Sequence, residues 1–73
     1  MTEITEKILN LICQEEEISI REIKNTLHIS TETLNEEMSF LADFGFVQLD
    51  KTVEFVRLSN WYKKFVNEIY VDL

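Results

Sequence analysis

The chain has 73 residues, of which 45% are hydrophobic, with one cysteine, one glycine and no proline. A chain of this length forms one small domain, and its apolar content is enough to build a core without disulfides or a structural metal. Fourteen acidic and seven basic side chains give a net charge of -7, which opposes general attraction to a polyanion such as DNA. We therefore expect a single ordered domain over residues 1–73.

The compartment is predicted from the N-terminus and from cysteine usage. The chain begins Met1-Thr2-Glu3 without a basic leader, and no apolar run approaches the roughly 18 residues of a membrane span. Cys13 has no partner for an internal disulfide, and no set of side chains has metal-ligand spacing. We expect a cytoplasmic protein that contacts no membrane and needs no cofactor.

A first helix is predicted over residues 3–15, with Thr2 as its cap. Its apolar positions recur at helical spacing, at Ile4, Ile8, Leu11 and Ile12. Cys13 lies at the edge of this apolar row. We expect its thiol to be buried or half-buried and to pack as a small hydrophobe.

Two further helices follow in close succession. A short apolar alternation at residues 18–20 indicates a strand, and Ser19-Ile20-Arg21-Glu22 is a capping box that starts a helix over about 20–27. Ser30 caps the next helix, over about 31–43. Its inward row is Leu34, Met38 and Leu41, with Phe40 and Ala42 beside it. Gly45 is placed where a helix ends in a left-handed turn.

Residues 46–58 are predicted to form an antiparallel hairpin. The β-branched and aromatic runs Phe46–Leu49 and Val53–Leu58 indicate two strands, joined by the tight turn Asp50-Lys51-Thr52.

A C-terminal helix is predicted over about 60–71, capped by Ser59 or Asn60. Its apolar side chains are Trp61, Tyr62, Phe65, Val66, Ile69, Tyr70 and Leu73. They spread over about half of the helix surface, wider than the roughly 100° stripe that covers one core. Either another molecule covers the excess, or the small core wraps deeply around this helix.

The order helix, strand, helix, turn, helix, hairpin resembles the winged helix-turn-helix family. Residues 20–27 with Ile29-Ser30 look like the family's first helix and turn, and residues 33–47 are similar to its recognition helix closing on a glycine before the wing. The resemblance covers residues 4–58 and implies an α+β winged helix, namely a three-helix core with a short β-hairpin wing, here followed by an added C-terminal helix.

The resemblance also implies which side chains face DNA. The groove-facing positions of the third helix are Thr31, Glu32, Thr33, Asn35, Glu36, Ser39 and Asp43. None of these is basic, although Arg and Lys usually supply the phosphate and guanine contacts. The candidate nucleic-acid contacts are therefore Arg21, Lys24, Thr31, Thr33, Asn35 and the wing lysine Lys51.

Two candidate partner surfaces remain. The first is acidic and lies on the third helix, at Glu32, Glu36 and Glu37. The second is aromatic and apolar and lies on the C-terminal helix, at Trp61, Tyr62, Phe65, Ile69 and Tyr70. A basic or apolar protein partner fits these surfaces, and a second copy of the chain fits the aromatic one.

Two functions follow from these observations. The first is a non-enzymatic transcriptional regulator that dimerises through its C-terminal helix and touches DNA weakly. The alternative is a protein-interaction winged helix that uses the acidic and aromatic surfaces. We do not expect an enzyme, because the sequence has no nucleophile, base and acid set and no phosphate-binding loop.

Overall fold

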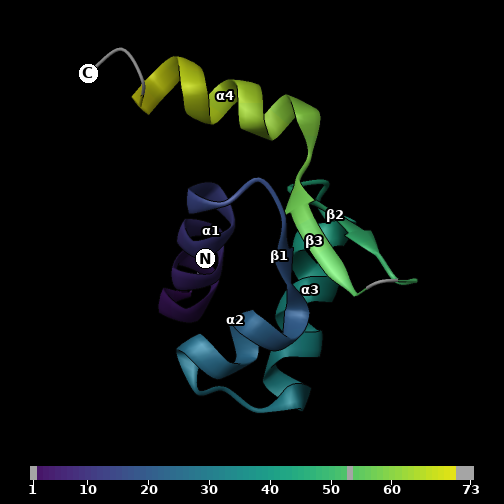
Figure 1. The fold of residues 1–73 in the computed structure, drawn as a ribbon. Helices are drawn as coiled ribbons and strands as arrows, with labels where there is room; N and C mark the ends of the chain where they lie inside the picture. Colours follow the sequence, from purple (N-terminus) through teal and green to yellow (C-terminus); the bar gives the residue numbers. More distant parts are fainter. Residues whose placement is uncertain (1, 53, 71–73) are drawn as a thin grey trace.

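A computed structural model describes residues 2–52 and 54–70, the last four of them by their backbone alone. The elements, in chain order, are α1 (Glu3–Gln14), β1 (Ile18–Ser19), α2 (Ile20–Leu27), α3 (Thr31–Asp43), β2 (Val47–Asp50), β3 (Phe55–Leu58) and α4 (Asn60–Tyr70). The three strands form one antiparallel sheet in the order β1-β3-β2. Helices α1, α2 and α3 gather beside this sheet, and α4 crosses over the end of the bundle (Figure 1). The predicted α+β architecture is confirmed.

Three hydroxyl side chains start the first three helices. Thr2, Ser19 and Ser30 have extended backbones, and each accepts a hydrogen bond from the backbone N–H three residues later at 3.0 to 3.1 Å. Each cap satisfies a donor that the first turn of a helix leaves unpaired, which stabilises the helix by about 1 kcal/mol. The predicted caps of these helices are therefore confirmed.

Left-handed residues end α2 and separate α3 from the wing. His28 has φ 55° at the end of α2, and its N–H bonds to the carbonyl of Lys24. Gly45 has φ 77°, and its N–H bonds to Ala42 while the next N–H bonds to Leu41. Paired bonds of this kind close a helix over a glycine, as predicted here.

The core lies where α1, α2 and α3 meet the inner face of the sheet. Its most deeply buried side chains are Ile8, Ile12, Ile18, Ile23, Leu34, Leu41 and Val56. Two predictions about burial are wrong. Cys13 is exposed on α1, and Phe40 is 38% exposed rather than packed beside the inward row of α3. Both lie at the edge of an apolar face, where the rotation of the helix against its neighbours decides which side chain is covered.

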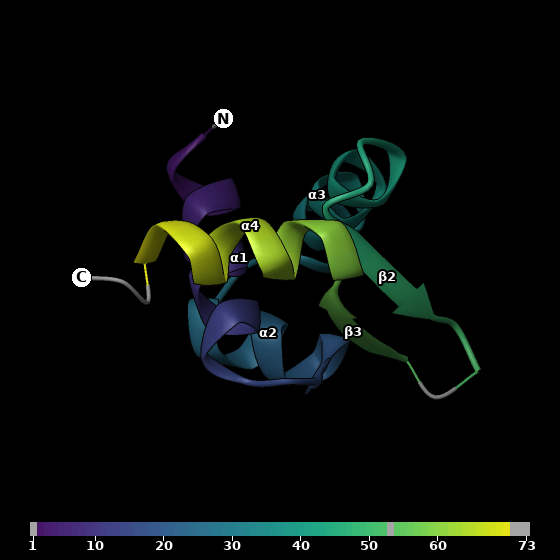
Figure 2. The same ribbon diagram turned by 90° about the horizontal axis from the view of Figure 1, so that it is seen from above.

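The hairpin projects sideways beyond the helices (Figure 2). Its first strand is shifted one residue toward the C-terminus, its second strand is shorter than predicted, and its connection is longer. Asp50 is the last residue of β2 rather than part of the turn, and its carboxylate accepts a bond from the N–H of Thr52 at 3.0 Å. Glu54 has φ 55° and precedes β3, which begins at Phe55. Val53, predicted as the first residue of this strand, lies outside the described residues.

Candidate functional site on the helix-turn-helix face and the aromatic corner

The corner between α2 and α3 places cations beside hydroxyl groups. Lys24 donates from Nζ to Oγ1 of Thr31 at 2.7 Å, across the turn. Arg21 lies three residues earlier on α2 and is exposed. Thr33 is half-buried, and its hydroxyl lies 3.0 Å from that of Ser30. The structure therefore brings Lys24 of α2 to Thr31 at the start of α3, and Arg21 lies about one turn before Lys24 on α2.

The outward face of α3 is acidic over its length. Glu32, Asn35 and Glu36 are exposed, and so are Ser39 and Asp43. Residues 31–50 contain no lysine or arginine. The face that would enter a DNA groove therefore presents carboxylates, which accept hydrogen bonds and repel phosphates, and one amide, which can also donate.

Glu37 lies apart from the other two acidic candidates. It is half-buried, and its carboxylate accepts hydrogen bonds from the hydroxyls of Thr5 at 2.7 Å and Thr2 at 3.3 Å. Both hydroxyls belong to the start of α1, where a negative charge interacts favourably with the helix dipole. Glu37 thus joins α3 to α1, while Glu32 and Glu36 remain on the outward face.

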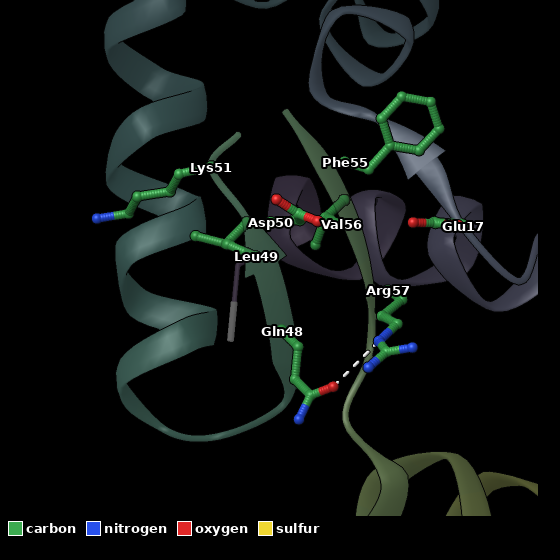
Figure 3. Close-up of a pocket in the computed structure, with 8 residues that line it drawn as sticks. All are labelled: Glu17, Gln48, Leu49, Asp50, Lys51, Phe55, Val56 and Arg57. Atoms are coloured by element: carbon green, nitrogen blue, oxygen red, sulfur yellow. Dashed lines mark hydrogen bonds between the residues drawn. The ribbon is translucent and has the colours of Figure 1, made fainter. Parts of the chain in front are cut away.

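The wing carries an open hollow of about 750 Å³ on the sheet. It is lined by Glu17, Gln48, Leu49, Asp50, Lys51, Phe55, Val56 and Arg57. Arg57 donates from Nε to Oε1 of Gln48 at 3.1 Å, while Lys51 extends away from Arg57 (Figure 3). The two cations of the wing therefore do not converge on one ligand. Arg57 is absent from the sequence-based candidates, although strand alternation with buried Val56 and Leu58 places it outward.

A second, smaller hollow of about 280 Å³ lies between the end of α1, strand β3 and α4. Cys13 is among the residues that line it. Although Cys13 is exposed at the surface, the protein atoms around its thiol exclude part of its solvent, and this desolvation raises the pKa of the thiol from its ordinary value. A thiol with a raised pKa holds less of the nucleophilic thiolate, so this cysteine is poorly suited to redox sensing.

Four aromatic side chains pack together where α4 meets the sheet. Phe46 lies 5.7 Å from Trp61 and 5.0 Å from Tyr62, measured between ring centroids, and Tyr62 stacks on Phe65 at 6.2 Å. Tyr62 is half-buried against the core, whereas Trp61 is 54% and Phe65 48% exposed. The candidates Ile69 and Tyr70 lie outside the residues whose side chains are described.

Trp61 is fixed in this aromatic corner by a hydrogen bond. Its indole N–H donates to the carbonyl of Gly45 at 2.7 Å, and a Cβ added at Gly45 would lie 3.5 Å from that indole nitrogen. The start of α4 is therefore attached to the turn that follows α3, while about half of the Trp61 surface stays exposed.

An exposed pair of phenylalanines near the end of α3 was not predicted from the sequence. Phe40 and Phe44 lie 4.8 Å apart between ring centroids, and Phe44 is 65% exposed. The only signal in the sequence was their spacing of four residues, which places two side chains on one helix face.

The described part of the chain contains neither a group of metal ligands nor a membrane-spanning helix. No group of three or more His, Cys, Asp or Glu side chains there is arranged to hold a metal ion. Over the same residues, none of the helices combines the length and the hydropathy needed to span a membrane.

Comparison with known proteins identifies the fold. No family model and no curated protein matches the sequence. Two solved structures match the whole arrangement, NadR in complex with 4-hydroxyphenylacetate and ligand-free NadR, with TM-scores of 0.82 and 0.80. Identity is 21% and 19%; the matches cover 99% of this chain but only 55% and 53% of the NadR chains. The chain spans about half the length of these proteins, and it shares their winged-helix fold.

Proposed function

We propose that this protein is a winged-helix regulator that acts without catalysis and touches DNA weakly through its α2–α3 corner. The observation that carries the proposal is the contact between Lys24 and Thr31 at the start of an exposed α3, within a fold shared with NadR. In helix-turn-helix docking the helix before the recognition helix crosses the phosphate backbone, so a cation there meets phosphate.

The charge distribution sets the strength of this contact. Arg21 and Lys24 are one helical turn apart on α2, and Asn35 on α3 has the donor and acceptor that read adenine. Glu32 and Glu36 on the same face of α3 repel the neighbouring phosphates. General DNA affinity is therefore expected to be millimolar or weaker at physiological salt, with tighter binding only at a specific sequence.

A titration of DNA with paired lysine and arginine variants tests the DNA contact. Fluorescence anisotropy at two salt concentrations, on a duplex selected from a random pool, is expected to show binding that weakens as salt rises. Arg21→Ala with Lys24→Ala should weaken it at least roughly tenfold, because each lost charged contact costs more than 1 kcal/mol. The control Lys63→Ala with Lys64→Ala removes the same charge from exposed positions on α4. Equal losses in both pairs, or no selected duplex, would contradict the DNA contact.

The exposed aromatics of α4 favour a second role, protein association, which is compatible with the first. Trp61 and Phe65 expose about half of their surfaces on adjacent turns of α4, which is the composition of an association surface. A second copy of the chain, pairing through α4 about a two-fold axis, would cover both.

Light scattering on the purified protein tests this association. The intact protein is expected to have the mass of two chains, and Phe65→Glu the mass of one, because a carboxylate would be buried unpaired in the contact. The matched control Phe44→Glu introduces the same charge at an exposed phenylalanine outside α4 and should leave the mass of two chains unchanged. A monomeric intact protein would remove the homodimer.

A further inference from the structure

The end of α3 presents an apolar surface that the rest of the described chain covers only in part: Phe40 is 38% and Phe44 65% exposed. Phe40 and Phe44 form this surface, which we call the α3 aromatic edge, and their rings lie 4.8 Å apart. The two rings pack against each other at a tilt of 42°, so a partner would meet them as one joint apolar contact. A phenylalanine exposed as far as Phe44 costs solvation free energy that burial under a partner would recover.

Acidic side chains border this edge. Glu36 lies four residues before Phe40 and Asp43 three residues after it, so both share its side of α3. Both carboxylates are exposed and lack a salt bridge within the described residues. No lysine or arginine lies between residues 31 and 50, so no cation on α3 or β2 can neutralise these two carboxylates.

We propose that the α3 aromatic edge binds a basic amphipathic segment of a partner protein. Apolar side chains of the segment cover Phe40 and Phe44, while its Lys or Arg side chains pair with Glu36 and Asp43. The proposal rests on the protein-association role above and gives it a second surface with a partner of defined chemistry.

Charge decides between the candidate occupants. Nucleic acid is repelled by the carboxylates of Glu36 and Asp43. Another copy of the chain brings a net charge of -7 and has no cation on its own α3 or β2. A basic segment alone satisfies both the aromatic and the acidic part of the surface.

A synthetic peptide tests the proposal directly. The probe is a short amphipathic peptide of Leu and Lys at helical spacing, and its control has Glu in place of each Lys. Trp61 is the only tryptophan in the chain and is bonded to Gly45, next to Phe44, so its emission reports on this corner. The Lys peptide is expected to shift the emission saturably and to bind more weakly as salt rises, while the Glu peptide leaves it unchanged.

Variants locate the site and keep the test falsifiable. Phe44→Ala and Asp43→Lys should each weaken the Lys peptide at least roughly tenfold. Glu22→Lys makes the same charge change at an exposed carboxylate on α2 and should weaken it less than about twofold. Equal effects of Asp43→Lys and Glu22→Lys, or binding of the Glu peptide, would overturn the site.

Two further outcomes separate this inference from the other proposals. If Phe44→Glu rather than Phe65→Glu converts a dimer to a monomer, the occupant is a second copy, and the basic segment is wrong. Loss of peptide binding in Phe44→Ala with unchanged DNA affinity supports the edge as a separate site. An intact protein that binds DNA but not the Lys peptide overturns the edge while leaving the DNA contact standing.

Discussion

Replacing Leu41 with alanine is expected to remove most of the stability of this protein. Leu41 is fully buried on α3, and its carbonyl accepts the N–H of Phe46 where the helix ends. Truncating a buried leucine costs about 2 to 5 kcal/mol, because the lost burial and the cavity add. A single core of this size supplies only about 3 to 5 kcal/mol of net stability. Urea unfolding followed by circular dichroism and Trp61 emission measures the loss.

The control for this variant is Phe44→Ala. It also truncates a large apolar side chain near the end of α3, but at an exposed position. Its free energy of unfolding should stay within about 0.5 kcal/mol of the intact protein. If Leu41→Ala cost less than about 1 kcal/mol, or if Phe44→Ala cost as much as Leu41→Ala, the described packing of α3 would be wrong.

Replacing Glu37 with alanine is expected to lower the free energy of unfolding by about 1 to 2 kcal/mol. The substitution removes the charged acceptor that lies 2.7 Å from the buried hydroxyl of Thr5. That hydroxyl keeps its contact with Thr2 at 2.8 Å, which limits the loss. Thermal and urea unfolding at neutral pH measure the difference.

The neighbour Glu36 supplies the matched control for Glu37. It is exposed on the same helix, so Glu36→Ala should change the free energy of unfolding by less than about 0.5 kcal/mol. Glu37→Gln retains an oxygen acceptor and should lie between Glu37→Ala and the intact protein. Equal values for Glu36→Ala and Glu37→Ala would show that the Thr5 contact does not stabilise the fold.

The sequence predicted the elements because local chemistry sets their ends. Ser19 and Ser30 satisfy backbone donors within three residues, and Gly45 adopts a left-handed turn at little steric cost. Such rules involve only near neighbours in the chain. The ends of the helices can therefore be predicted from the sequence before any tertiary contact is known.

The distribution of side chains between core and surface could not be predicted in the same way. The sequence predicted Glu37 as part of the outward acidic surface of α3, and only the position of α1 shows that it meets Thr5 instead. The exposure of Phe40 and Cys13 likewise depends on how far each helix is rotated in the bundle. A turn of a few tens of degrees decides such cases, and single-residue hydrophobicity does not encode it.

The candidate site was predictable in part. The pairing of Lys24 with Thr31 follows from their places on either side of a short turn, and both were named from the sequence. The α3 aromatic edge was not predicted. Phe44 caps the end of α3 just before Gly45, so the sequence pattern indicated only that it belongs to the turn that ends the helix.

The order of the sheet also bears on how the chain folds during synthesis. Strand β3 lies in the middle, so Ile18, which follows α1, can pair with Val56 only after α2, α3 and β2 have been made. Pairing of residues so far apart closes a long loop, which slows folding. Until β3 leaves the ribosome, the three N-terminal helices keep an open apolar side. The core is therefore completed only once β3 is present, and we expect a chain truncated before Phe55 to leave Ile18 without its partner Val56 and to aggregate.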